Sequence, residues 1–148
     1  SEVIVTGVPD VEAQRVVHLL NCSLGSYPLK YLGLPISPLK LLAKYFTPAV
    51  TKVGNRVSSW RGRYNSKAGK VALTNACLSS FPMFLMGFYL LTGGIHAGFD
   101  KHRGAFYWNS TDNKRKYRMV KWDLICRPKC MGGLGIINTM VDDVMYLG

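Results

Sequence analysis

The stretch TPAVTKVGNRVSSWRGRYNSKAGKV, residues 47–71, decides how this sequence folds. Thr47 followed by Pro48 predicts the start of a helix, because threonine caps helices and proline is tolerated at the first helical position. Apolar residues then recur at steps of three and four, which is the spacing of one buried helical face. These residues are Val50, Val53, Val57 and Trp60. The pattern therefore predicts a helix from Thr47 to about Trp60, with Lys52 and Arg56 outside the buried stripe.

Two further helices are expected after this one. Ser66 is a second predicted cap, and the helix that it opens should end before Pro82, because proline disfavours a helical residue before it. A third helix is expected from about Ile95 to Trp108, after the break at Gly93-Gly94. Its predicted buried stripe consists of Ile95, Phe99, His102 and Phe106.

The first 36 residues and the end of the chain predict short strands. The segment EVIVTG, residues 2–7, is rich in β-branched residues, and a helix with Asp10 as its cap and Asn21 as its stop should follow it. In GSYPLKYLGLPI, residues 25–36, glycines and prolines punctuate apolar residues, which predicts extended pieces joined by turns. The segment LGII, residues 134–137, is expected to be extended as well. The fold class is therefore mainly α with a few short β-strands, an α+β arrangement.

Charge is the most informative feature of the composition. The 148 residues include 19 Lys plus Arg and 8 Asp plus Glu, for a net charge of +11. Between Glu12 and Asp100 there is no acidic residue, although ten basic ones fall in that interval. A positive field of this kind favours polyanions, and RNA, DNA or an RNA–DNA hybrid are the expected partners. The alternative is a solvated basic face with no partner.

The candidate nucleic-acid-binding residues lie in two segments. Arginine offers forked donors to phosphate, lysine offers a point charge, and an aromatic ring can stack on a base. The first segment contributes Lys52, Arg56, Arg61, Arg63, Tyr64, Lys67 and Lys70, and the second contributes Lys114, Arg115 and Lys116. Trp60 either shares this role or belongs wholly to the core.

No catalytic residue is predicted. Asp142 and Asp143 resemble the paired aspartates of polymerases, but a two-metal site needs a further carboxylate from another strand, and Asp123 is among the few candidates. We expect the pair to be a solvated acidic turn of a terminal helix. No P-loop, dinucleotide-binding glycine motif or Ser-His-Asp arrangement occurs.

No metal site or disulfide is predicted. Cys126 and Cys130, with His96 and His102, allow a zinc site to be drawn, but the histidines fall on an apolar helical stripe. The four cysteines, which are Cys22, Cys77, Cys126 and Cys130, should be free thiols, because no secretory signal is visible. An intracellular protein, nuclear or cytoplasmic, is expected. The most apolar run, residues 81–91, is shorter than the roughly 20 residues that a membrane span needs, so no membrane partner is expected.

Four blocks in order resemble one family. They are SEVIVTGVP, GSYPLKYLGLPI, VSSWRGRYNSKAGKVALTNACLSSFPMF and FYWNSTDNKRKYRMVKWDLICRPKCMGGLGI. This order is similar to the region downstream of the catalytic core in reverse transcriptases of plant LINE-type (non-LTR) retrotransposons. The resemblance covers nearly the whole chain.

The resemblance implies a fragment of a larger polymerase. Residues 1–36 correspond to trailing palm strands and a turn, residues 37–92 to a helical thumb-like bundle, and residues 93–148 to a connection region before a Cys/His-rich segment. The palm aspartates, which would bind Mg²⁺ and polymerise DNA, lie upstream of Ser1, so the chain itself is expected to hold no cofactor. Cys130 stands where the family commonly has a charged residue, which argues against a zinc ligand.

A rival interpretation is an inert or repurposed remnant of a retroelement that acts, if at all, through protein–protein contacts. Loss of the palm would expose Ile4, Leu32 and Leu34, and exposed apolar surface promotes association.

Overall fold

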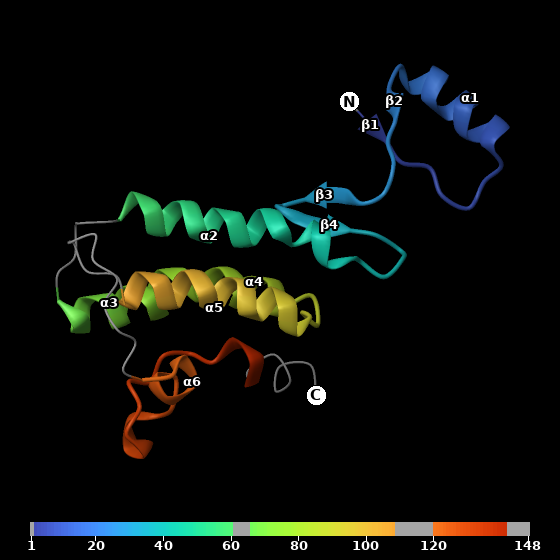
Figure 1. The fold of residues 1–148 in the computed structure, drawn as a ribbon. Helices are drawn as coiled ribbons and strands as arrows, with labels where there is room; N and C mark the ends of the chain where they lie inside the picture. Colours follow the sequence, from blue (N-terminus) through green and yellow to red (C-terminus); the bar gives the residue numbers. More distant parts are fainter. Residues whose placement is uncertain (1, 61–65, 109–119, 142–148) are drawn as a thin grey trace. The chain divides into compact units, whose positions relative to one another are not determined.

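The computed structural model describes residues 2–60, 66–108 and 120–141 (Figure 1). The chain divides into two compact units, Ser1–Tyr45 and Phe46–Gly148. Helices dominate, and the four strands are two or three residues long. This confirms the predicted fold class, mainly α with a few short strands. Within the described ranges, no helix is long and apolar enough to cross a membrane.

The first unit begins with a small β-α-β arrangement. Strand β1 (Glu2–Val3) pairs in parallel with β2 (Ser23–Leu24), and α1 (Asp10–Leu20) connects them. The helix ends at Asn21 in the left-handed conformation, as predicted. The predicted cap was wrong by one position: Pro9 is the N-cap and Asp10 is the first helical residue, because Pro9 is the last residue with extended backbone. An acidic residue in the first turn still complements the helix dipole.

A β-hairpin closes the first unit. Strands β3 (Leu29–Tyr31) and β4 (Leu34–Ile36) pair antiparallel, with Tyr31 opposite Leu34. The two residues between them, Leu32 and Gly33, both have positive φ angles of 51° and 87°. Positive φ at both residues is typical of a two-residue hairpin turn whose twist matches that of the strands. The hairpin confirms the extended pieces predicted for residues 25–36. A short 3-10 turn η1 (Ala43–Tyr45) follows.

The second unit opens with α2 (Thr47–Ser59). Phe46 rather than Thr47 is its N-cap, because the Phe46 carbonyl accepts the Val50 N–H at 3.3 Å, so Thr47 lies inside the helix. The predicted cap is therefore wrong by one residue. Val53 and Val57 are buried, whereas Val50 and Trp60 are only half-buried. Trp60 packs against Phe106 with its ring centroid 5.7 Å away.

Three consecutive helical segments come next in this unit: α3 (Lys67–Leu73), a π-helical turn η2 (Thr74–Leu78) and α4 (Ser80–Met86). Ser66 caps α3, since its hydroxyl accepts the Gly69 N–H at 2.9 Å, as predicted. The prediction that this helix ends before Pro82 is confirmed, because the helical run from Lys67 ends at Leu78; the new helix α4, which contains Pro82, was not predicted. The π turn restarts the helix at Ser80, and proline is tolerated in a first turn, where its missing N–H leaves no bond unmade.

Helix α5 (Gly93–Trp108) packs along α2 and runs in the same direction (Figure 1). Close contact is possible because glycines face the partner helix: a Cβ on Gly98 would lie 3.2 Å from the Val50 side chain. The predicted helix is confirmed, and three of its four stripe residues are buried; His102 is only half-buried. The core of the helical unit contains Val53, Val57, Leu78, Leu85, Met86, Ile95, Phe99 and Phe106.

The chain then forms α6 (Trp122–Ile125), a 3-10 turn η3 (Lys129–Met131) and an irregular segment through residue 138, after which residues 139–141 are helical. Ile125, Cys126 and Ile136 cluster with Tyr107 of α5. The LGII segment was predicted to be extended, but residues 134–137 join no sheet. Their backbone groups bond elsewhere: Leu134 N–H donates to the Ile125 carbonyl at 2.8 Å.

The unit boundary falls between Tyr45 and Phe46. The finer division into residues 1–36, 37–92 and 93–148 rests on the resemblance to polymerases and stays a prediction.

Candidate nucleic-acid interface

The exposed face of α2 carries two of the predicted site residues, Lys52 and Arg56. Both lie outside the buried stripe because the valines occupy the face that meets α5. The Arg56 guanidinium carbon lies 5.3 Å from the centroid of the Phe81 ring. An arginine over an aromatic face keeps its charge and is held in a preferred position. Arg56 is therefore a positioned, exposed cation.

Lys67 lies at the far end of the helical unit, where α3 begins and α5 ends. Its ammonium nitrogen is 5.3 Å from the Tyr107 ring centroid and 5.4 Å from that of Trp108. The lysine is exposed, so its charge still faces solvent. The structure thus brings one predicted basic residue together with two aromatic rings that sequence reasoning did not assign to the site.

The remaining predicted residues divide into two groups. Lys70 is only 8% exposed, so it offers little surface to a phosphate, and its backbone continues α3. Lys70 shares the packed face with the buried Thr74 and Leu78, which follow it at steps of four, and this periodicity could have shown its burial. The others lie outside the described residues: Arg61, Arg63, Tyr64, Lys114, Arg115 and Lys116. So do Asp142 and Asp143.

A buried polar cluster, which the sequence did not predict, holds residues 135–139 against the helices. Arg103 is fully buried, bonds the Asp100 carboxylate at 2.7 Å through Nη1 and donates through Nη2 to the Ile137 carbonyl. Asn75 donates to the Gly135 carbonyl at 2.9 Å and accepts the Ile137 N–H at 3.1 Å. We call Asn75, Arg103 and these backbone partners the clamp. Arg103 therefore has a structural role, although its charge adds to the basic total.

Burial is the largest influence on the pKa of Asp100, the acidic residue of this cluster. It raises the pKa of the Asp100 carboxyl, while the Arg103 charge and, to a smaller extent, the Trp122 indole and His96 oppose the shift. His96 itself is buried, with Nδ1 3.2 Å from the Thr139 hydroxyl.

The residues considered for zinc lie in separate surroundings. His96 contacts Thr139, while His102 lies against Gly54 of α2. In the parts of the chain that the structure describes, no group of three or more His, Cys, Asp or Glu side chains could hold a metal ion. Cys22, Cys77, Cys126 and Cys130 are free thiols. Burial raises the pKa of the Cys126 thiol to about 11, against the opposing charge of Arg103.

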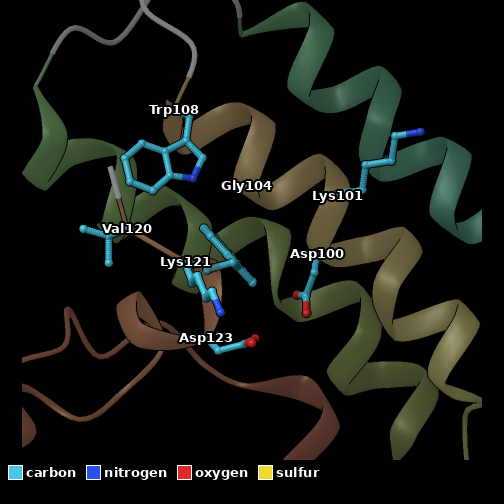
Figure 2. Close-up of a pocket in the computed structure, with 8 residues that line it drawn as sticks. Asp100, Lys101, Gly104, Trp108, Val120, Lys121 and Asp123 are labelled. Carbon is cyan, nitrogen blue, oxygen red and sulfur yellow. The ribbon is translucent and has the colours of Figure 1, made fainter. Parts of the chain in front are cut away.

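A cleft of about 490 Å³ opens between α5 and the segment that begins α6 (Figure 2). From α5 come Asp100, Lys101, Gly104 and Trp108, and from the later segment come Val120, Lys121, Trp122 and Asp123. The figure shows Trp108 at one end and the two aspartates toward the other. Aromatic rings, lysines and carboxylates therefore line one concave surface.

Comparison with known proteins gives one partial similarity. The chain is 37% identical over 103 residues to a curated protein of Arabidopsis thaliana named "Putative ribonuclease H protein". The match covers 70% of this chain and 17% of that protein, so the chain spans only a small part of its relative. No family model matches the chain, and no solved structure matches it.

Proposed function

We propose that this chain is the non-catalytic, nucleic-acid-gripping part of a LINE-type reverse transcriptase, and that it holds RNA, DNA or their hybrid through backbone phosphates. The observation that carries the proposal is the exposed basic surface of the helical unit, formed by Lys52, Arg56 and Lys67. We call these three residues the basic surface. It belongs to a stretch of sequence, residues 13–99, that has no carboxylate to oppose it. Surfaces without a ligand normally mix both signs.

Lys67 lies where two helical segments of this unit meet. Helix α2 ends at Ser59, α3 begins at Lys67 and α5 ends at Trp108, and the contact of Lys67 with Trp108 shows that two of these ends meet. The arginines of residues 61–65 and the basic run 114–118 are connected to the same ends in the chain. Contacts to phosphate carry charge but little base information, so low sequence specificity is expected.

The similarity to a plant protein named for ribonuclease H supports the same class of ligand, a nucleic acid. The order of the four sequence blocks supports the narrower assignment to a reverse transcriptase thumb and connection. Under this proposal Mg²⁺ belongs to the palm of the full polymerase, the chain itself binds no cofactor, and the remainder of the polymerase is its partner inside the cell, in nucleus or cytoplasm.

A charge-matched comparison tests the proposal. Lys52→Ala with Arg56→Ala removes two charges from the basic surface, while Arg127→Ala with Lys129→Ala removes two exposed charges from the turn around η3. Binding of a labelled RNA–DNA hybrid should weaken clearly in the first variant and little in the second. Equal weakening in both would mean that only total charge matters, and no weakening in either would refute the interface.

A second candidate function, protein–protein contact, is favoured by the apolar surface of the first unit. Leu19, Leu32 and Leu39 are 82%, 78% and 77% exposed. The expectation for Leu32 is confirmed, but Ile4 is half-buried and Leu34 is buried, because Leu34 is the inward residue of the β4 strand. Sedimentation of the purified chain separates the candidates: self-association without hybrid binding would favour the remnant. An in-frame palm with its aspartates encoded directly upstream would favour the polymerase.

A further inference from the structure

The cleft beside α5 has aromatic walls that the gripping of phosphates does not require. Trp108 and Trp122 both line it, and both are half-buried. Gly104 allows one of these rings to lie directly on the helix, since a Cβ there would meet three atoms of the Trp122 ring at 3.5 to 3.8 Å. Part of each indole therefore remains available to a planar ligand.

The charges around the cleft suit the sugar-phosphate part of a nucleotide. Lys101 and Lys121 line it and are exposed. Of its two carboxylates, Asp100 is already bonded to Arg103, so Asp123 is left as the exposed acid. In Figure 2 the ammonium group of Lys101 points away from the other lining side chains, so Lys121 is the cation of the cleft. An acid in such a site can accept an N–H from the exocyclic amine of a base.

The cleft adjoins Lys67, one residue of the basic surface. Trp108 lines the cleft, and the Lys67 ammonium lies over the same indole at 5.4 Å. A strand whose phosphates follow the basic surface would therefore reach the cleft at Trp108. The volume, about 490 Å³, falls in the usual range of small-ligand sites.

We propose that this cleft receives one unpaired nucleobase of a single-stranded nucleic acid, stacked on Trp108, with an adjoining phosphate on Lys121. The inference rests on the proposed function and narrows it, because a paired base is stacked within its duplex and cannot enter. Stacking tolerates every base, so the site adds affinity for single strands without strong sequence preference.

The tryptophans themselves provide the measurement. The chain has three, and the third, Trp60, lies on α2 against Phe106. Trp60→Phe keeps a ring at that position and leaves only the two cleft tryptophans to fluoresce. This protein is titrated with a short single-stranded oligonucleotide and with an abasic strand of the same length and charge. The base-containing strand should quench the fluorescence and bind about tenfold more tightly or better.

The outcomes separate this inference from the function on which it rests. Equal affinity and equal quenching for both strands would overturn the cleft site and leave phosphate gripping intact. Failure of both strands to bind would overturn both proposals. Trp108→Leu should abolish the advantage of the base-containing strand while abasic binding remains, and circular dichroism checks that it folds. If it does not fold, the titration of the Trp60→Phe protein still decides.

Discussion

Gly54 is the residue at which helix packing leaves no room for a side chain. A Cβ at this position would lie 2.7 Å from the His102 ring carbon Cε1, closer than real Cβ atoms approach a neighbour. Gly54→Ala would gain up to about 1 kcal/mol of helix propensity but lose about 1–3 kcal/mol to overpacking. We therefore expect a lower free energy of unfolding, measured by urea denaturation.

Two variants test the cause. Gly94→Ala meets nothing within 4 Å and should be neutral or slightly stabilising. Gly54→Ala combined with His102→Ala removes the clashing ring and should cost less than the sum of the two single changes. If Gly54→Ala stabilised the protein as much as Gly94→Ala, the close approach of α2 and α5 would be contradicted.

The thiols differ in reactivity for an electrostatic reason. Burial raises the pKa of Cys126 to about 11, so at pH 8 only about one thiol in a thousand is ionised there, whereas Cys130 is exposed. Iodoacetamide at pH 8 should label Cys130 well before Cys126, as read by peptide mass spectrometry. Because the folded pKa lies above the unfolded value, stability from Cys126 is present below about pH 9 and is lost as the pH rises through about 11. Equal labelling of both thiols would contradict the packing of α6.

At the scale of elements, the clamp explains how an irregular segment is held without a sheet. Asn75 satisfies both the Gly135 carbonyl and the Ile137 N–H. Asn75→Ala leaves these groups unpaired, which should cost about 1–3 kcal/mol of unfolding free energy. Hydrogen exchange should accelerate at Ile137 and stay unchanged in α2. Asn55→Ala, at an exposed position on α2, is the control and should have little effect on stability. Unchanged exchange at Ile137 would show that the clamp does not hold the segment.

The sequence predicts the elements that depend on residues close together in the chain, and it does not predict those that depend on residues far apart in it. The three long helices, α1, α2 and α5, follow from local periodicity, and Ser66 and Asn21 act as expected, whereas the predicted caps Asp10 and Thr47 were each wrong by one residue. Helix α4, which contains Pro82, does not follow from the sequence, because it depends on the π turn, whose Ser79 N–H and hydroxyl both bond the Thr74 carbonyl at 2.9 Å. The clamp was also beyond prediction, since Asn75 and Arg103 are 34 to 62 residues away in the chain from the backbone groups that they bond. The burial of Arg103 and Lys70 was missed because charge alone suggested exposure.

The molecule as a whole is expected to bind nucleic acid without catalysing a reaction on it. The purified chain should not extend a primer on an RNA template with Mg²⁺ or Mn²⁺, because the metal-binding aspartates of the resembled polymerases lie upstream of this region. Asp142→Asn with Asp143→Asn should therefore change neither extension nor hybrid binding. Metal-dependent synthesis that this double change abolished would overturn the division of roles, and extension is followed by gel analysis of a labelled primer.

The salt dependence of hybrid binding tests the central claim, phosphate gripping, most directly. Each phosphate neutralised by a cation releases counterions, so the logarithm of the association constant should fall linearly with the logarithm of salt concentration, by about 0.7–0.9 per neutralised phosphate. Titrating a labelled RNA–DNA hybrid with the chain from low to high salt should give a steep line. Its slope should shrink by about one for each phosphate that is no longer neutralised. The variant Arg61→Ala with Arg63→Ala should therefore lower the slope by about two. Its melting temperature should barely move. A flat response to salt, or a slope unchanged in that variant, would contradict the claim.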